Sequence, residues 1–341
     1  MNKEQNKEVE QTNRDTAPIP IPDAKFDEYL EESAKKEQLY SIGFFDILGF
    51  SNFVEQNRTQ VIMDLYQRLL DLVYSQQSRR EGENRRTGAV PVPASDDCKN
   101  SFYVAQGNGF VNVIHFSDTF LIYVNYDIAG QPFWLRDSKY EPHPLTYNEK
   151  GALLYKNFFN KPSIYPAFLK TCMDFFCSAL LAGIPLRGCI STGMATMDKF
   201  RDIYIGKPLV EAAKGEPERK SIGITYGKSF CHYHTIYNDY HIPFLNHVKG
   251  DFDSVRYLSP MAVDWPRYWR LYSDYNQYSI KDCIMKMNNN EQFSHYYTNA
   301  IEFSEFSEQH QNWSQEVNWD GITDIFDFYE RTKQWYNNIT Q

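Results

Sequence analysis

The chain has 341 residues and a formal net charge of -9 at pH 7. That length allows one large domain, or a catalytic domain with an appendage, whose core needs no disulfide or metal. The acidic balance argues against a protein that coats nucleic acid and against a basic membrane-binding patch.

The N-terminal segment, residues 1–38, is polar and contains a Pro-Ile-Pro-Ile-Pro run, which favours a disordered tail followed by a short charged helix over 26–36. It has no apolar signal-peptide region, and no stretch of the chain approaches the ~18 apolar residues of a membrane span. The six cysteines lack metal-site spacing and are typical of reduced thiols. These features predict a cytoplasmic protein without a membrane partner.

The first strand is predicted over 39–49, where a near-continuous apolar run around Asp46 is typical of a central strand covered by helices. Apolar residues then recur at helical spacing over 61–73, which predicts an amphipathic helix. Residues 78–108 are charged and aperiodic, as in a surface insertion.

The run 110–124 predicts two strands joined by a tight turn at Ser117 and Asp118, because both residues favour turns. A second insertion, rich in Pro, Gly and aromatic residues, covers 127–162. A helix with a buried apolar side follows over 164–180.

A strand is predicted over 184–193, a short helix over 208–215 and a further strand over 221–226. Beyond residue 230 the chain is rich in Tyr, Trp, Phe and Asn. Helices are predicted there, the last over 324–336, and they are expected to pack on the sheet.

The order of these elements is βαββαβ with decorations, which predicts an α+β fold with a ferredoxin-like split βαβ sheet. We expect a catalytic domain over 39–230 and a helical, aromatic-rich C-terminal extension over 231–341 that packs on it. The fold alone specifies no function.

Asp46 and Asp118 carry the strongest chemical signal. In a split βαβ sheet the first strand lies beside the hairpin, so the two carboxylates come within a few ångströms of each other. Two carboxylates that close repel unless a divalent cation lies between them, and oxygen ligands suit Mg²⁺ or Mn²⁺. Either residue alone is more simply a turn residue, but together they predict a metal site for a triphosphate.

Four segments carry a family resemblance. Residues 45–51 (Phe-Asp-Ile-Leu-Gly-Phe-Ser) resemble the F-x-D-I-x-G-F-S/T signature of class III nucleotidyl cyclases, and 116–118 match the position of the second metal aspartate of that family. Residues 186–193 are similar to its R-x-G-I-x-x-G strand, and 204–214 to its G-x-x-V-N-x-A-x-R segment.

This resemblance implies a homodimer with shared active sites and two divalent ions, Mn²⁺ or Mg²⁺, per site. Asp46, Asp118 and the main chain of Ile47 would bind the ions. The resemblance also implies that the metal aspartates come from one protomer and the transition-state residues from the other.

Three further residues are candidates for the substrate, each with a structural alternative. Arg187 is a candidate catalytic residue that neutralises phosphate charge across the dimer interface, or it forms an edge salt bridge. Lys214 is a candidate to stabilise the pentacovalent phosphate, or it is a solvated lysine at a helix end. Phe50 is a candidate to line the base pocket, or it belongs to the core. His115 is interpreted as a core or edge histidine rather than a ligand.

Departures from the purine cyclases point to another substrate. No lysine precedes Asp118 within residues 113–116, and Val210, or Glu211 in a shifted register, stands where that family has asparagine. The pattern is closest to the Pycsar pyrimidine cyclases of bacterial antiphage defence. That resemblance implies UTP, or alternatively CTP, as substrate and a cyclic product that activates a separate effector. The acidic charge balance predicts no nucleic-acid partner.

Other functions remain as alternatives: a catalytically silent nucleotide sensor of the same fold, a palm-type or diguanylate-cyclase-like nucleotidyltransferase, and a structural protein built on the aromatic C-terminal third. A sensor of this kind is expected to lack one of the metal aspartates, and a diguanylate cyclase is expected to have a GG[DE]EF hairpin. The chain keeps both aspartates and has Phe-Ser-Asp-Thr-Phe at 116–120.

Overall fold

The computed structural model describes eight stretches of the chain. They are residues 37–71, 111–125, 164–198, 201–229, 240–249, 256–287, 291–318 and 325–340. The predicted helix over 26–36 and the predicted insertions at 78–108 and 127–162 lie outside these residues.

The first half of the fold is the predicted βαββαβ unit. Its elements are β1 (Gln38–Ile47), α2 (Phe50–Gln56), a helix over 59–71, β2 (Val111–Phe116), β3 (Thr119–Asn125), α6 (Ile164–Leu181) and β4 (Leu186–Asp198). The strands lie in the order β2-β3-β1-β4, and every neighbouring pair is antiparallel. This is the ferredoxin-like arrangement, so the predicted α+β class and strand order are confirmed. The short helix α2 was not predicted.

The sheet continues past this unit. It gains β5 (Ile203–Gly206) beside β4, and then β6 (Gly223–Gly227), β7 (His241–Pro243) and β8 (Leu258–Val263). Between β5 and β6 lie α7 (Lys207–Gly215) and a 3-10 turn, η2 (Glu216–Glu218). Beyond residue 230, where helices were predicted, the chain also forms β7 and β8, which extend the same sheet and were not predicted. Each contains a proline, Pro243 or Pro260, which makes a strand hard to recognise from sequence.

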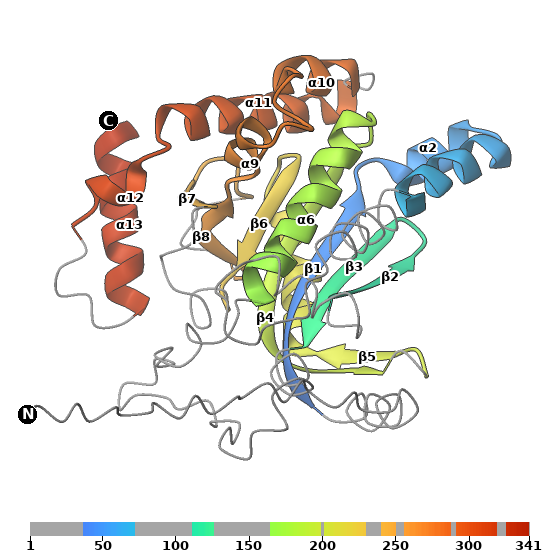
Figure 1. Ribbon diagram of the computed structural model, residues 1–341, viewed down its shortest axis with the longest axis horizontal. Coiled ribbons are helices and arrows are strands. Elements are labelled where there is room, and N and C mark those ends of the chain that lie inside the picture. Colours follow the sequence, from blue (N-terminus) through green and yellow to red (C-terminus); the bar gives the residue numbers. More distant parts are fainter. Residues whose placement is uncertain are drawn as a thin grey trace, which may run out of the picture.

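The other described elements of the C-terminal third are helices and a 3-10 turn. They are α9 (Trp265–Leu271), α10 (Ile280–Met287), η4 (Glu291–Phe293), α11 (Ser294–Gln309), α12 (Trp313–Glu316) and α13 (Ile325–Thr340). Figure 1 shows these helices gathered beside the β6–β8 side of the sheet and α6 lying across its face. Among the described residues, no helix is long and apolar enough to cross a membrane.

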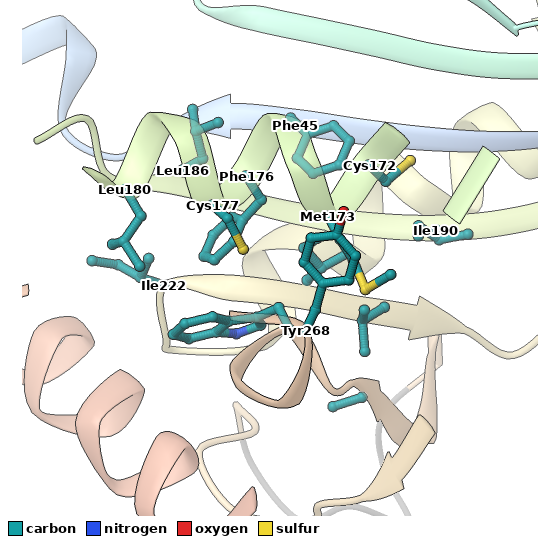
Figure 2. Close-up of a cluster of buried hydrophobic side chains, with 14 of the residues drawn as sticks. Phe45, Cys172, Met173, Phe176, Cys177, Leu180, Leu186, Ile190, Ile222 and Tyr268 are labelled. Atoms are coloured by element: carbon teal, nitrogen blue, oxygen red, sulfur yellow. The ribbon is translucent and has the colours of Figure 1, made fainter. Parts of the chain in front are cut away.

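One continuous core joins the βαββαβ unit to the C-terminal third. Figure 2 shows Phe45 of β1, Phe176 of α6 and Leu186 of β4 converging with Tyr268 of α9. The rings of Phe176 and Trp265 lie 4.9 Å apart, so α9 packs directly on α6. Aromatic residues of the C-terminal third therefore share the core that lies under α6.

The residues of β1 alternate between the two faces of the sheet. Phe45 and Ile47 belong to the core under α6, whereas Tyr40 and Ile42 belong to a smaller cluster on the opposite face. Asp46 follows the second set, so its side chain lies on the face opposite α6. The prediction that β1 is a central strand is confirmed, since it lies between β3 and β4.

We expect Trp265→Ala to lower the free energy of unfolding by about 3–5 kcal/mol, because Trp265 is fully buried and its removal leaves a cavity at the junction of α9 and α6. Leu271→Ala on the same helix is a matched control, since Leu271 is 61% exposed, and it should change stability by less than about 0.5 kcal/mol. Urea unfolding followed by fluorescence measures both. Equal, small effects would show that the C-terminal third does not share the core.

Candidate active site

Strand register brings Asp46 and Asp118 to the same end of the sheet. Asp46 pairs with Thr119 of β3, and Asp118 immediately precedes Thr119 in the two-residue turn of the β2–β3 hairpin. Ser117, the first residue of that turn, has a φ of 51°, a left-handed conformation that a tight hairpin requires. The predicted turn is confirmed, and it projects Asp118 toward β1.

The two carboxylates are close enough to affect each other. Burial raises the pKa of the Asp46 carboxyl, Arg187 opposes that rise, and the charge of Asp118 and its contact with Asp46 add to it. A carboxyl with a raised pKa beside a second carboxylate is the arrangement that a cation relieves. The structure therefore unites the two residues that the sequence paired.

Arg187 lies on β4, opposite Asp46 on the neighbouring strand β1. The two residues are cross-strand partners in the β1–β4 ladder, and Arg187 Nη2 donates a hydrogen bond to Asp46 Oδ2 at 3.1 Å. Arg187 is also 2.6 Å from a second carboxylate, measured from its Nε to Glu216 Oε1 in η2. That second contact is an ion pair without the alignment of a hydrogen bond. One guanidinium thus joins two carboxylates.

Glu216 is a site residue that the sequence did not reveal. Its side chain is only 6% exposed, and burial raises its pKa to about 7, against the opposing effect of Arg187 and with smaller contributions from Asp46 and Asp118. It stands in the charged stretch Lys-Gly-Glu-Pro-Glu-Arg-Lys (214–220), which is typical of a solvated surface. Only the packing of η2 against β1 and β4 reveals that it is buried.

The C-terminal third forms one wall of the site. The ring of Tyr296 in α11 lies under Arg187, with 5.4 Å from the guanidinium carbon to the ring centroid. Gln292 accepts a hydrogen bond from Asn52 at 3.2 Å. Gly49 has a φ of 76°, and a Cβ there would lie 2.8 Å from the Phe293 ring. The loop after Asp46 therefore needs glycine, both for its backbone and for this close approach.

The other three predicted residues have surroundings of their own. Ile47 follows Asp46 and is buried. Phe50 is half-buried, packs against the core and stacks on Phe53. Lys214, at the end of α7, is exposed and donates a hydrogen bond to the Tyr257 hydroxyl at 3.2 Å. Their roles toward substrate or metal stay predictions.

Three residues discussed for substrate specificity have clear surroundings. Val210 is half-exposed on α7. Glu211 accepts a hydrogen bond from the main-chain N–H of Ser229 at 2.7 Å, and burial raises its pKa. His115 is exposed, 3.3 Å from the Tyr66 hydroxyl. It is therefore an edge histidine, as predicted.

The donor set suits a divalent cation shared with a phosphate. Within the described stretches, no three His, Cys, Asp or Glu side chains form a group that could hold a metal ion on their own. Mg²⁺ at phosphate sites commonly uses one or two carboxylates and takes its remaining ligands from water and phosphate oxygens. Asp46 and Asp118 provide that number, and the repulsion between their carboxylates is what a cation would relieve.

The raised pKa of Glu216 predicts a pH-dependent stability in the metal-free protein. The pKa is about 7 in the fold and 4.5 in the unfolded chain, so between these values unfolding releases a proton. The contribution of Glu216 to stability is therefore full below pH 4.5 and is lost as the pH rises through about 7. From pH 4.5 to pH 8 the wild type should lose on the order of 3 kcal/mol relative to Glu216→Gln. Urea unfolding of both proteins across this range measures the difference, and parallel curves would contradict it.

Comparisons with known proteins add little to this geometry. Neither protein-family models nor curated proteins yield a match to the chain. Among solved structures, the chain is similar to the "crystal structure of the catalytic core of a rhodopsin-guanylyl cyclase with converted specificity in complex with ATPalphaS", with 16% identity over 65% of this chain and 94% of that chain, and a TM-score of 0.35. At that identity and TM-score the likeness assigns no activity, and the proposal below rests on the residues of this chain.

Proposed function

We propose that this protein is a nucleotidyl cyclase, which converts a nucleoside triphosphate into a 3',5'-cyclic nucleotide and pyrophosphate. The observation that carries the proposal is the contact between Asp46 and Asp118 beside Arg187, at one end of a ferredoxin-like sheet. The segments around these three residues are among those that resemble the class III cyclase motifs. In the reaction the ribose 3'-oxygen bonds to the α-phosphorus, the bond to the β-phosphate oxygen breaks, and the hydroxyl proton passes to solvent.

In this proposal each residue has a defined task. Asp46, Asp118 and the main-chain carbonyl of Ile47 hold two divalent ions, Mn²⁺ or Mg²⁺, which when bound act as Lewis acids toward the phosphates and the 3'-hydroxyl. Arg187, held beside Asp46 of its own chain, adds positive charge next to the phosphates bound there rather than across the dimer interface. Phe50 would contact the base.

We propose a pyrimidine nucleotide as substrate, with UTP preferred over CTP. The support is the sequence around the hairpin, where residues 113–116 (Val-Ile-His-Phe) offer no lysine to read a purine. His115 is exposed on that strand and contacts Tyr66. By the same resemblance, the cyclic product would activate a separate antiphage effector.

We propose that two chains share each active site. By the resemblance, Lys214, which donates a hydrogen bond to Tyr257 of its own chain, acts on the phosphate in the partner's site. The β4–β5 hairpin, which Figure 1 shows extending from the lower part of the sheet, exposes apolar side chains on one side of its ribbon: Met194 (40%), Ile203 (42%) and Ile205 (67%). Exposed apolar surface of this kind supports a protein partner there, and a second copy of the chain is the partner proposed.

The test is to incubate the purified protein with each of the four ribonucleoside triphosphates and Mn²⁺ and to identify the product by mass. The proposal predicts cyclic UMP with stoichiometric pyrophosphate. Cyclic CMP alone would change the base assignment, and a product only from ATP or GTP would overturn the pyrimidine assignment. Absence of any cyclic product would favour the alternative of a catalytically silent nucleotide sensor with this fold.

A further inference from the structure

The carboxylates of Asp46 and Glu216 both contact the single guanidinium of Arg187. The guanidinium of Arg187 contacts Asp46 through Nη2 and Glu216 through Nε, at 3.1 and 2.6 Å. The two carboxylates come from different parts of the chain, β1 and η2, so the position of Arg187 depends on both. The side chains of Arg187 and Asp46 are 14% and 20% exposed, which limits the water available to replace either partner.

The consequences for Asp46 follow from geometry. A guanidinium with one carboxylate partner tends to bind it through two parallel N–H groups, which occupies both oxygens. Here Nε is engaged by Glu216, and the hydrogen bond to Asp46 uses Nη2 and one oxygen, Oδ2. The ring of Tyr296 lies against the guanidinium and further restricts its position.

We propose that Glu216 is a positioning residue: it holds Arg187 away from full pairing with Asp46, so that Asp46 keeps oxygen available for a divalent cation. The inference rests on the proposed function, because it assumes that Asp46 binds the cation. It adds a residue and a role that the cyclase motifs quoted above do not assign. When Glu216 is removed, Arg187 turns to Asp46 and competes with the cation.

Mn²⁺ alone is the probe, and binding is measured without nucleotide from the electron paramagnetic resonance signal of the free ion. Glu216→Gln should weaken Mn²⁺ binding about tenfold, as loss of a residue that orients a metal ligand typically does. Glu216→Asp separates position from charge, because it keeps the charge but draws the carboxylate back from Nε by one methylene. The proposal predicts the same loss for Glu216→Asp. Glu218→Gln is the matched control: Glu218 lies in the same turn, accepts a hydrogen bond from the Tyr257 main chain and should leave Mn²⁺ binding unchanged.

The outcomes are distinguishable. Wild-type binding by Glu216→Asp, with weakened binding by Glu216→Gln, would overturn the positioning role in favour of a simple charge effect. Wild-type binding by both variants would overturn it outright. Asp46→Asn tests the underlying assumption: if wild-type Mn²⁺ binding is absent or survives this change, the metal role in the proposed function fails, and this inference with it. Thermal melting checks that each variant is folded.

Discussion

Asp46→Asn and Asp118→Asn are each expected to lower the cyclisation rate by at least about a thousandfold, since each removes a charged oxygen ligand whose ion contributes several kcal/mol of transition-state stabilisation. The measurement is pyrophosphate release under saturating Mn²⁺ and UTP. Asp64→Asn, an exposed residue on the helix over 59–71, is the control and should retain full activity.

The same variants should remain folded, so that a loss of activity can be assigned to the chemical step rather than to unfolding. Asp118 contributes to the raised pKa of Asp46, so Asp118→Asn removes a repulsion in the metal-free protein. Its melting temperature should equal or exceed that of the wild type. An inactive variant that is also strongly destabilised, or an Asp46→Asn protein with more than a tenth of wild-type activity, would contradict the assignment.

The second large effect is expected from mixing two inactive chains. Lys214→Ala should lower the rate about a hundredfold, in the range seen when a single transition-state donor is lost. When Lys214→Ala and Asp46→Asn chains are co-expressed with different tags and the mixed dimer is purified, one of its two sites combines intact aspartates with an intact Lys214. An unseparated one-to-one mixture should then recover about a quarter of wild-type activity, because half the dimers are mixed and each has one complete site.

A site confined to one chain gives the opposite result. Each single variant would then carry its own defect, and the mixture would show only the average of the two. Co-expression of Asp46→Asn with Asp118→Asn is the matched control, because both defects lie in the same half of the site. That mixture should recover no cyclase activity, whichever protomer supplies Lys214.

Much of the fold follows from local patterns in the sequence. The βαββαβ order is readable because β1 is a continuous apolar run and α6 has helical periodicity, and Ser117 and Asp118 indicate the hairpin turn. The short helix α2 was missed because its seven residues include none that is buried and it has no side-chain cap. Strands β7 and β8 were missed because prolines interrupt them.

Part of the candidate site was also predictable from the sequence, and part was not. Asp46 and Asp118 are predictable because strand order fixes which strand ends meet. Glu216 and Tyr296 are not, because their relation to Arg187 depends on how η2 and α11 pack against the sheet, far from the motifs in sequence. A glutamate in a charged stretch carries no local sign of burial, and an aromatic residue in a tyrosine-rich segment carries no sign of stacking on a cation.

The most direct test of the metal role is a crystal structure with Mn²⁺ and a UTP analogue that lacks the 3'-hydroxyl, collected for anomalous scattering from manganese. We expect an anomalous peak within about 2.2 Å of carboxylate oxygens from both Asp46 and Asp118, with phosphate oxygens completing the coordination. A triphosphate bound with its ions on other residues, or these two carboxylates without an ion between them, would contradict it.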